Sequence, residues 1–139
     1  MRERNPIPQG KYVPAKRCGN LIFTAGMTPR NNGVLIMEGP VRVDQDVSAY
    51  ADAVRQAVKN ALVAASNTLG ENESIQSVLT LTVYVNAQEG FIAHSKLADI
   101  ASEYLCEQLG EAGVAARAAV GVATLPGNAP CEIQLVACC

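Results

Sequence analysis

Apolar side chains recur every three or four residues between positions 47 and 69, and polar side chains fill the positions between them. This spacing predicts an amphipathic helix. Asp46 or Ser48 can cap its start, and Gly70 stands where a helix usually ends. The same period returns over residues 91–109. The sequence therefore predicts two helices.

Strand-like patterns occupy most of the rest of the chain. Over residues 75–85, Leu and Val alternate with Thr and Tyr, which indicates a strand with two different faces. Shorter apolar and β-branched segments bounded by Gly, Asn or Pro predict five further strands. These strands cover 13–18, 20–25, 34–37, 118–125 and 131–137. The predicted order is β-β-β-α-β-α-β-β, an α+β domain spanning residues 1–139.

Two helices of this length can cover only one face of such a sheet. Yet Thr80, Thr82, Tyr84 and the small residues at 118–123 are not charged enough for a fully wet second face. The pattern favours association with copies of the same chain, which would bury the uncovered face. A half-polar face that is exposed to water is the alternative.

The composition disfavours nucleic-acid binding. Of 139 residues, 11 are basic and 13 acidic, so the formal net charge is −2, and aromatic residues make up only 4% without any Trp. Phosphate binding needs clustered Lys and Arg, and base stacking needs aromatic platforms. We expect no nucleic-acid partner.

The sequence also points to the cytoplasm. It has no apolar run of the ~20 residues that cross a bilayer, and residues 1–10 lack the apolar core of an export signal. The five cysteines show no CxxC spacing, and the single His94 has no partner at zinc-ligand spacing. We expect reduced thiols, no metal and no membrane contact.

Two isolated charges stand out within apolar strands, Arg117 and Glu132. A guanidinium can hold a carboxylate through two parallel hydrogen bonds, and a nearby carboxylate can position water or move a proton. A charge at the start of an edge strand can equally be a solvated or ion-paired surface residue. Spacing alone leaves both interpretations open.

The wider sequence around these charges resembles one known family. Residues 10–12 are GKY, 19–29 are GNLIFTAGMTP, 116–126 are ARAAVGVATLP, and 131–133 are CEI. These segments resemble the opening and closing signatures of the RidA family (YjgF/YER057c/UK114). The resemblance extends from Tyr12 to Ala137 and keeps the family's spacing of fifteen residues between Arg117 and Glu132. The chain looks like a less characterised branch of that family.

This resemblance implies a chorismate-mutase-like α+β fold, with two helices on one face of the sheet. It also implies a homotrimer in which the sheets form a central barrel and ligands bind between subunits. The best-known activity of the family is hydrolysis of enamines and imines of amino acids to 2-oxo acids and ammonia, without a cofactor, as in 2-iminobutanoate/2-iminopropanoate deaminase. By resemblance, Arg117 holds the substrate carboxylate, Glu132 activates water, and Tyr12 closes the pocket.

Four further pocket positions depart from the deaminating members. Ala25 and Met27 stand where those proteins usually have Ser and Gln, Ser95 aligns with an Asn, and Ala119 replaces a frequent Cys. These substitutions remove a hydroxyl and an amide, so a larger or more apolar ligand is expected, or loss of catalysis.

Three functions follow from these residues and this resemblance. The first is an imine hydrolase acting on a small carboxylate-bearing intermediate, and the second is a module that binds such a carboxylate without turnover. The third, an endoribonuclease or translation inhibitor, conflicts with the charge and the scarcity of aromatics. For Cys18 and Cys131 we expect packing rather than catalytic roles. His94 is expected on the exposed or interfacial side of the second helix, without a catalytic role.

Overall fold

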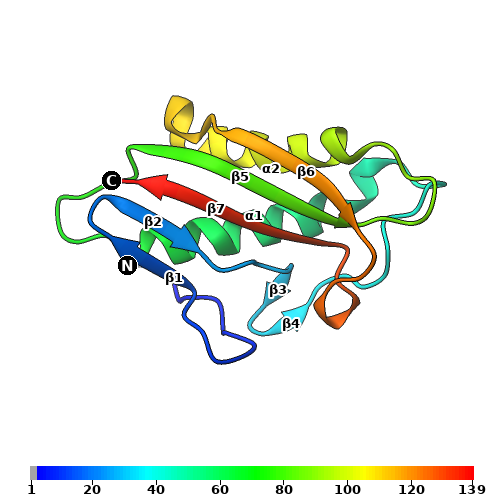
Figure 1. Cartoon of the computed structure of the whole chain (residues 1–139), viewed down its shortest axis with the longest axis horizontal. Helices are drawn as coiled ribbons and strands as arrows, with labels where there is room; N and C mark the ends of the chain where they lie inside the picture. The colour runs from blue at the N-terminus through cyan, green and yellow to red at the C-terminus, as the bar shows by residue number, and fades with distance from the viewer. Residues whose placement is uncertain (1–2) are drawn as a thin grey trace.

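Four short strands come first along the chain, and two long helices and three longer strands follow, in a computed structural model that describes residues 3–139 (Figure 1). Met1 and Arg2, the start of the segment in which we expect no export signal, lie outside the described residues. The elements are β1 (Ala15–Cys18), β2 (Leu21–Thr24), β3 (Arg30–Asn31), β4 (Val34–Leu35), η1 (Val47–Tyr50), α1 (Ala51–Ser66), β5 (Ser77–Asn86), α2 (His94–Leu109), η2 (Gly110–Gly113), β6 (Ala116–Val122), η3 (Pro126–Asn128) and β7 (Cys131–Cys138).

Five of these strands form one sheet in the order β1-β2-β7-β5-β6. The β5–β6 pair is parallel and the other pairs are antiparallel. Both long helices pack on the same side of this sheet, as Figure 1 shows. The predicted α+β class and the two-helix layer are thus confirmed, and β6 is an edge strand of the sheet.

The core lies between the helices and the sheet, and the alternation along β7 shows how the sequence creates it. Cys131, Ile133, Leu135 and Ala137 are at most 1% exposed, whereas the residues between them are partly or fully exposed. Successive side chains of a strand point to opposite faces, so the buried set faces the helices. Glu132 consequently points to the other face.

The boundaries of several elements differ from the expected ones. The strand expected at 34–37 is only the two-residue β4, which pairs with β3 in a separate small sheet. The second helix begins at His94 rather than at 91, because Gly90 has a positive φ of 90° and the Phe91 N–H closes a turn onto Gln88. β6 begins two residues earlier than expected, so Arg117 lies within the strand.

The face opposite the helices is uncovered and partly apolar. Leu21, Phe23 and Val120 are 40–45% exposed there. The register places Phe23 beside Val136, which in turn lies beside Thr80. This half-polar surface fits the pattern expected from the sequence.

No helix in residues 3–139 has the length and apolar character needed to span a membrane.

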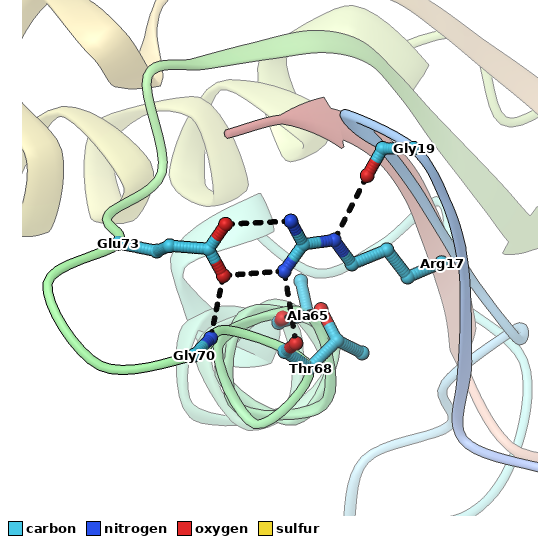
Figure 2. A network of polar contacts seen from close by, with 6 residues as sticks. All are labelled: Arg17, Gly19, Ala65, Thr68, Gly70 and Glu73. Atoms are coloured by element: carbon cyan, nitrogen blue, oxygen red, sulfur yellow. Dashed lines mark hydrogen bonds and ion pairs between the residues drawn. The ribbon is translucent and has the colours of Figure 1, made fainter.

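A network of hydrogen bonds and one ion pair connects the edge strand β1 to the segment that follows α1 (Figure 2). The Arg17 guanidinium donates to both carboxylate oxygens of Glu73 at 2.6 Å and to the Thr68 carbonyl at 3.2 Å. Glu73 also accepts the Gly70 N–H. The Arg17 hydrogen bonds, and then the Gly70 N–H, lower the pKa of Glu73 to about 2.

Candidate functional site

Arg117 lies on the helix-facing side of β6 and is held by three residues of α2. Its Nη1 donates to Asp99 Oδ1 at 2.8 Å and to Ser102 Oγ at 3.0 Å. Its Nη2 donates to Ser95 Oγ at 2.8 Å and to the Ser95 carbonyl at 3.2 Å. The Arg117 side chain is 19% exposed and that of Asp99 is 59% exposed. The guanidinium is therefore fixed at the sheet edge but remains accessible to solvent.

Glu132 lies on the uncovered face, in the cross-strand row that contains Tyr84 and Val120. Its carboxylate packs against Gly26, where a Cβ atom would overlap Glu132 Oε2. Partial burial raises the pKa of the Glu132 carboxyl above its ordinary value. A carboxylate with a raised pKa suits proton transfer near neutral pH better than an ordinary one.

The two charges singled out in the sequence do not meet within one chain. Arg117 and Glu132 lie on opposite faces of the sheet, and β5 separates their strands. Two strand spacings alone amount to roughly 10 Å, and their register partners on β5, Leu81 and Tyr84, are three residues apart. Each charge therefore belongs to its own half-site, and we name these the Arg117 half-site and the Glu132 half-site.

The other predicted residues divide between these half-sites. Ser95 contacts Arg117 directly, and Ala119 follows on the same face of β6. Ala25 and Met27 flank Gly26 in the segment after β2, where Met27 exchanges two backbone hydrogen bonds with Ile133. Their positions bring Ala25 and Met27 close to Glu132.

Tyr12 and Met27 line a cavity of about 410 Å³ beside the Glu132 half-site. The phenol oxygen of Tyr12 accepts the Gln9 N–H at 3.0 Å. Asn60 of α1 also lines this cavity and donates to the Thr28 carbonyl at 3.2 Å, which holds the segment after Met27 in place. Glu132 does not line this cavity. The walls are formed by the N-terminal segment, the segment 26–33 and α1.

Sequence reasoning missed three residues that shape the half-sites. Asp99 and Ser102 bind the guanidinium, and Gly26 makes room for the carboxylate. A signal for the first two was present, because Ser95, Asp99 and Ser102 follow each other by four and three residues and so share one face of a helix. Gly26 gives no such signal, since its importance depends on a close approach between distant segments.

The packing role expected for Cys131 is confirmed, whereas Cys18 is exposed, so the packing role expected for Cys18 is wrong. Cys131 is buried, and this burial raises the pKa of its thiol to about 12, which favours the protonated, unreactive form. The His94 ring contacts the edge of Phe91, with the ring centroids 5.0 Å apart, and lies over Gly121. Within residues 3–139, no group of three or more His, Cys, Asp or Glu side chains is arranged to hold a metal ion.

Comparisons with known proteins extend over nearly the whole chain. A family model described as "YjgF/chorismate_mutase-like, putative endoribonuclease" matches residues 6–139. A RutC family protein of Pyrococcus horikoshii is 30% identical over 135 residues, which cover 97% of this chain and 92% of that protein.

Two solved structures are also similar. Protein Atu1372 of Agrobacterium tumefaciens, of unknown function, is 32% identical with a TM-score of 0.86, covering 96% of this chain and 84% of that one. A "putative endoribonuclease" from Shewanella oneidensis is 29% identical with a TM-score of 0.89, covering 100% and 92%. The family match, together with the shared fold and the retained Arg117 and Glu132, establishes that this chain belongs to the YjgF (RidA) family.

Proposed function

We propose that the protein is a hydrolase of 2-imino acids whose site forms between two copies of the chain. The observation that carries this proposal is the pair of half-sites, an accessible guanidinium at Arg117 and a half-buried carboxylate at Glu132, on opposite faces of one sheet. In a closed ring of subunits, the Arg117 half-site of one copy can face the Glu132 half-site of the next.

The proposed assembly is a homotrimer with the uncovered sheet faces turned inward. Exposed apolar side chains on that face, among them Phe23 and Val120, support this arrangement because burial removes them from water. The family match over residues 6–139 supports treating the whole chain as one domain. Five cysteines without a disulfide fit a reducing cytoplasm.

The chemistry needs only these groups and water. The substrate is a protonated 2-imino acid, whose carboxylate binds at Arg117. Glu132 accepts a proton from a water molecule while the water oxygen bonds to the imine carbon, and the C=N bond becomes a C–N bond. Glu132 then returns this proton to the nitrogen. The hydroxyl gives its own proton to Glu132 as its oxygen forms the C=O bond and the C–N bond breaks, and the released ammonia takes up that proton, so the products are ammonium and a 2-oxo acid. Orientation and proton transfer account for the acceleration, since the protonated imine is already electrophilic.

The test is a coupled assay in which an amino-acid oxidase generates imines and semicarbazide competes for them. Wild-type protein is expected to lower semicarbazone formation. Glu132→Gln should reduce the hydrolysis rate by about 10²–10⁴-fold, the range for a lost general base. Arg117→Ala should weaken substrate binding by about 10–100-fold, because charge-assisted hydrogen bonds are lost. Glu38→Gln, at an exposed position, is the matched carboxylate control.

Other outcomes would identify the rival functions. The apolar substitutions at Ala25, Met27 and Ala119 favour one rival, a module that binds 2-oxo acids without turnover. Arg117-dependent binding of 2-oxo acids with no effect on semicarbazone formation would establish that module. RNA binding that weakens steeply with salt would instead favour the endoribonuclease activity after which the family model is described.

A further inference from the structure

The terminal nitrogens of Arg117 are already occupied within the chain. Nη1 donates to Asp99 and Ser102, and Nη2 donates twice to Ser95. Each terminal nitrogen carries two N–H bonds, so these four hydrogen bonds use all of them. A ligand carboxylate that takes two parallel bonds from the guanidinium must therefore replace at least one of these partners.

Asp99 is the charged partner of Arg117, and a ligand can reach it from solvent. Its side chain is 59% exposed, and it holds Arg117 through a single 2.8 Å bond. It is the anionic partner of the guanidinium, whereas Ser95 and Ser102 are neutral. The Arg117–Asp99 pair thus presents a positive and a negative charge side by side to any ligand that approaches the sheet edge.

We propose that Asp99 is a specificity-determining residue that selects ligands in which a cationic nitrogen neighbours the carboxylate. This inference rests on the proposed function. A plain anion that binds Arg117 lies beside the negative charge of Asp99, which is unfavourable. In a zwitterion, the cationic nitrogen is a new partner for the Asp99 carboxylate, while the ligand carboxylate binds Arg117.

The substrate and the product of the proposed reaction differ in whether a positive charge lies next to the carboxylate. A protonated 2-imino acid carries a positive nitrogen on the carbon next to its carboxylate, and the 2-oxo acid product carries only the negative charge. Asp99 therefore favours the substrate over the product and speeds product release. Without Asp99, Arg117 would hold the anionic product more tightly.

Calorimetric titration with two stable probes tests this inference. The probes are L-2-aminobutanoate, a zwitterion, and 2-oxobutanoate, an anion with the same carbon skeleton. For wild-type protein we expect the zwitterion to bind more tightly. In Asp99→Asn, which keeps the size and an acceptor oxygen, the ratio of the anion Kd to the zwitterion Kd should fall by about tenfold. Asp52→Asn, at an exposed position of α1, should leave the ratio unchanged.

If the ratio of the two Kd values is the same in Asp99→Asn as in wild-type protein, the inference is overturned. This includes the case in which both probes lose affinity equally, which is what a purely structural role of Asp99 predicts. Failure of both probes to bind to any of these proteins would overturn it as well. The proposed function is judged separately. Imine hydrolysis by wild-type protein with an unchanged ratio removes only the role of Asp99, whereas a shifted ratio without hydrolysis removes only the reaction.

Discussion

Gly26 is the position where the smallest change should most directly disturb the Glu132 half-site. A Cβ atom at this position would lie 2.8 Å from Glu132 Cδ and 3.2 Å from Cγ, and it would overlap Oε2. Since Gly26 is not among the glycines with positive φ, alanine fits its backbone conformation. The substitution Gly26→Ala therefore acts by moving the carboxylate and not by straining the main chain.

The expected loss of folding free energy in Gly26→Ala depends on how easily the Glu132 side chain can move. Overpacking of a core costs about 1–3 kcal/mol, and the free end of a glutamate yields more readily than backbone does. We therefore expect Gly26→Ala to lower the free energy of unfolding by about 1 kcal/mol. In the Glu132→Ala background the obstructing atoms are gone, so the cost of Gly26→Ala should fall to within a few tenths of a kcal/mol of zero.

Urea unfolding of the four proteins at one protein concentration measures this coupling, because association would otherwise shift the apparent stability. The hydrolysis assay provides a second readout, and Gly26→Ala should lose about 10²-fold in rate through the misplaced carboxylate. An equal destabilisation by Gly26→Ala in both backgrounds would refute the reasoning, because it would show that Glu132 is not the group that Gly26 accommodates.

Four other predictions concern single groups. The pKa of Glu73 is about 2 in the folded protein against an ordinary 4.5, so its contribution to stability is complete above pH 4.5 and is lost as the pH falls to about 2; Glu73→Gln should flatten urea-unfolding stability in that window. Gly113→Ala should destabilise the fold by about 1–3 kcal/mol in the same measurement, because its Cβ would overlap the Leu105 carbonyl, which is backbone and cannot move aside. The Cys131 thiol, with a pKa of about 12, should resist iodoacetamide in the native protein while exposed thiols react, and mass spectrometry of the labelled peptides would show any exception. Because burial raises the pKa of Glu132 and a general base must be deprotonated, the hydrolysis rate should fall on acidification at a higher pH than an ordinary carboxyl would give, and Glu132→Gln should remove that limb of the pH profile.

The regular elements could be predicted from the sequence because their periodicity is strong. The helices at α1 and α2 and the strand β5 carry long, unambiguous patterns. Their ends were less predictable, since a turn such as the one at Gly90 depends on backbone conformation more than on hydrophobic spacing. The pairing of β3 with β4 likewise depends on a local turn between two very short segments.

The candidate site was predictable as a set of residues but not as an arrangement. Arg117 and Glu132 stand out because charge is rare in their strands. That they face opposite sides of the sheet depends on the strand order and register, which join segments far apart in the chain. The engagement of Arg117 by Asp99 required the packing of α2 against β6 to be known.

The central claim, that Arg117 of one copy works with Glu132 of another, can be tested by mixing two variants that each lack one of these charges, at a substrate concentration too low for either variant alone to show activity. Arg117→Ala and Glu132→Ala are unfolded together in equal amounts, refolded, and assayed for imine hydrolysis. In a closed ring with random exchange, about a quarter of the sites combine an intact Arg117 with an intact Glu132. The mixture should therefore regain about a quarter of the wild-type activity. A mixture that forms mixed assemblies, as mass spectrometry can show, yet stays as inactive as its components would contradict the claim.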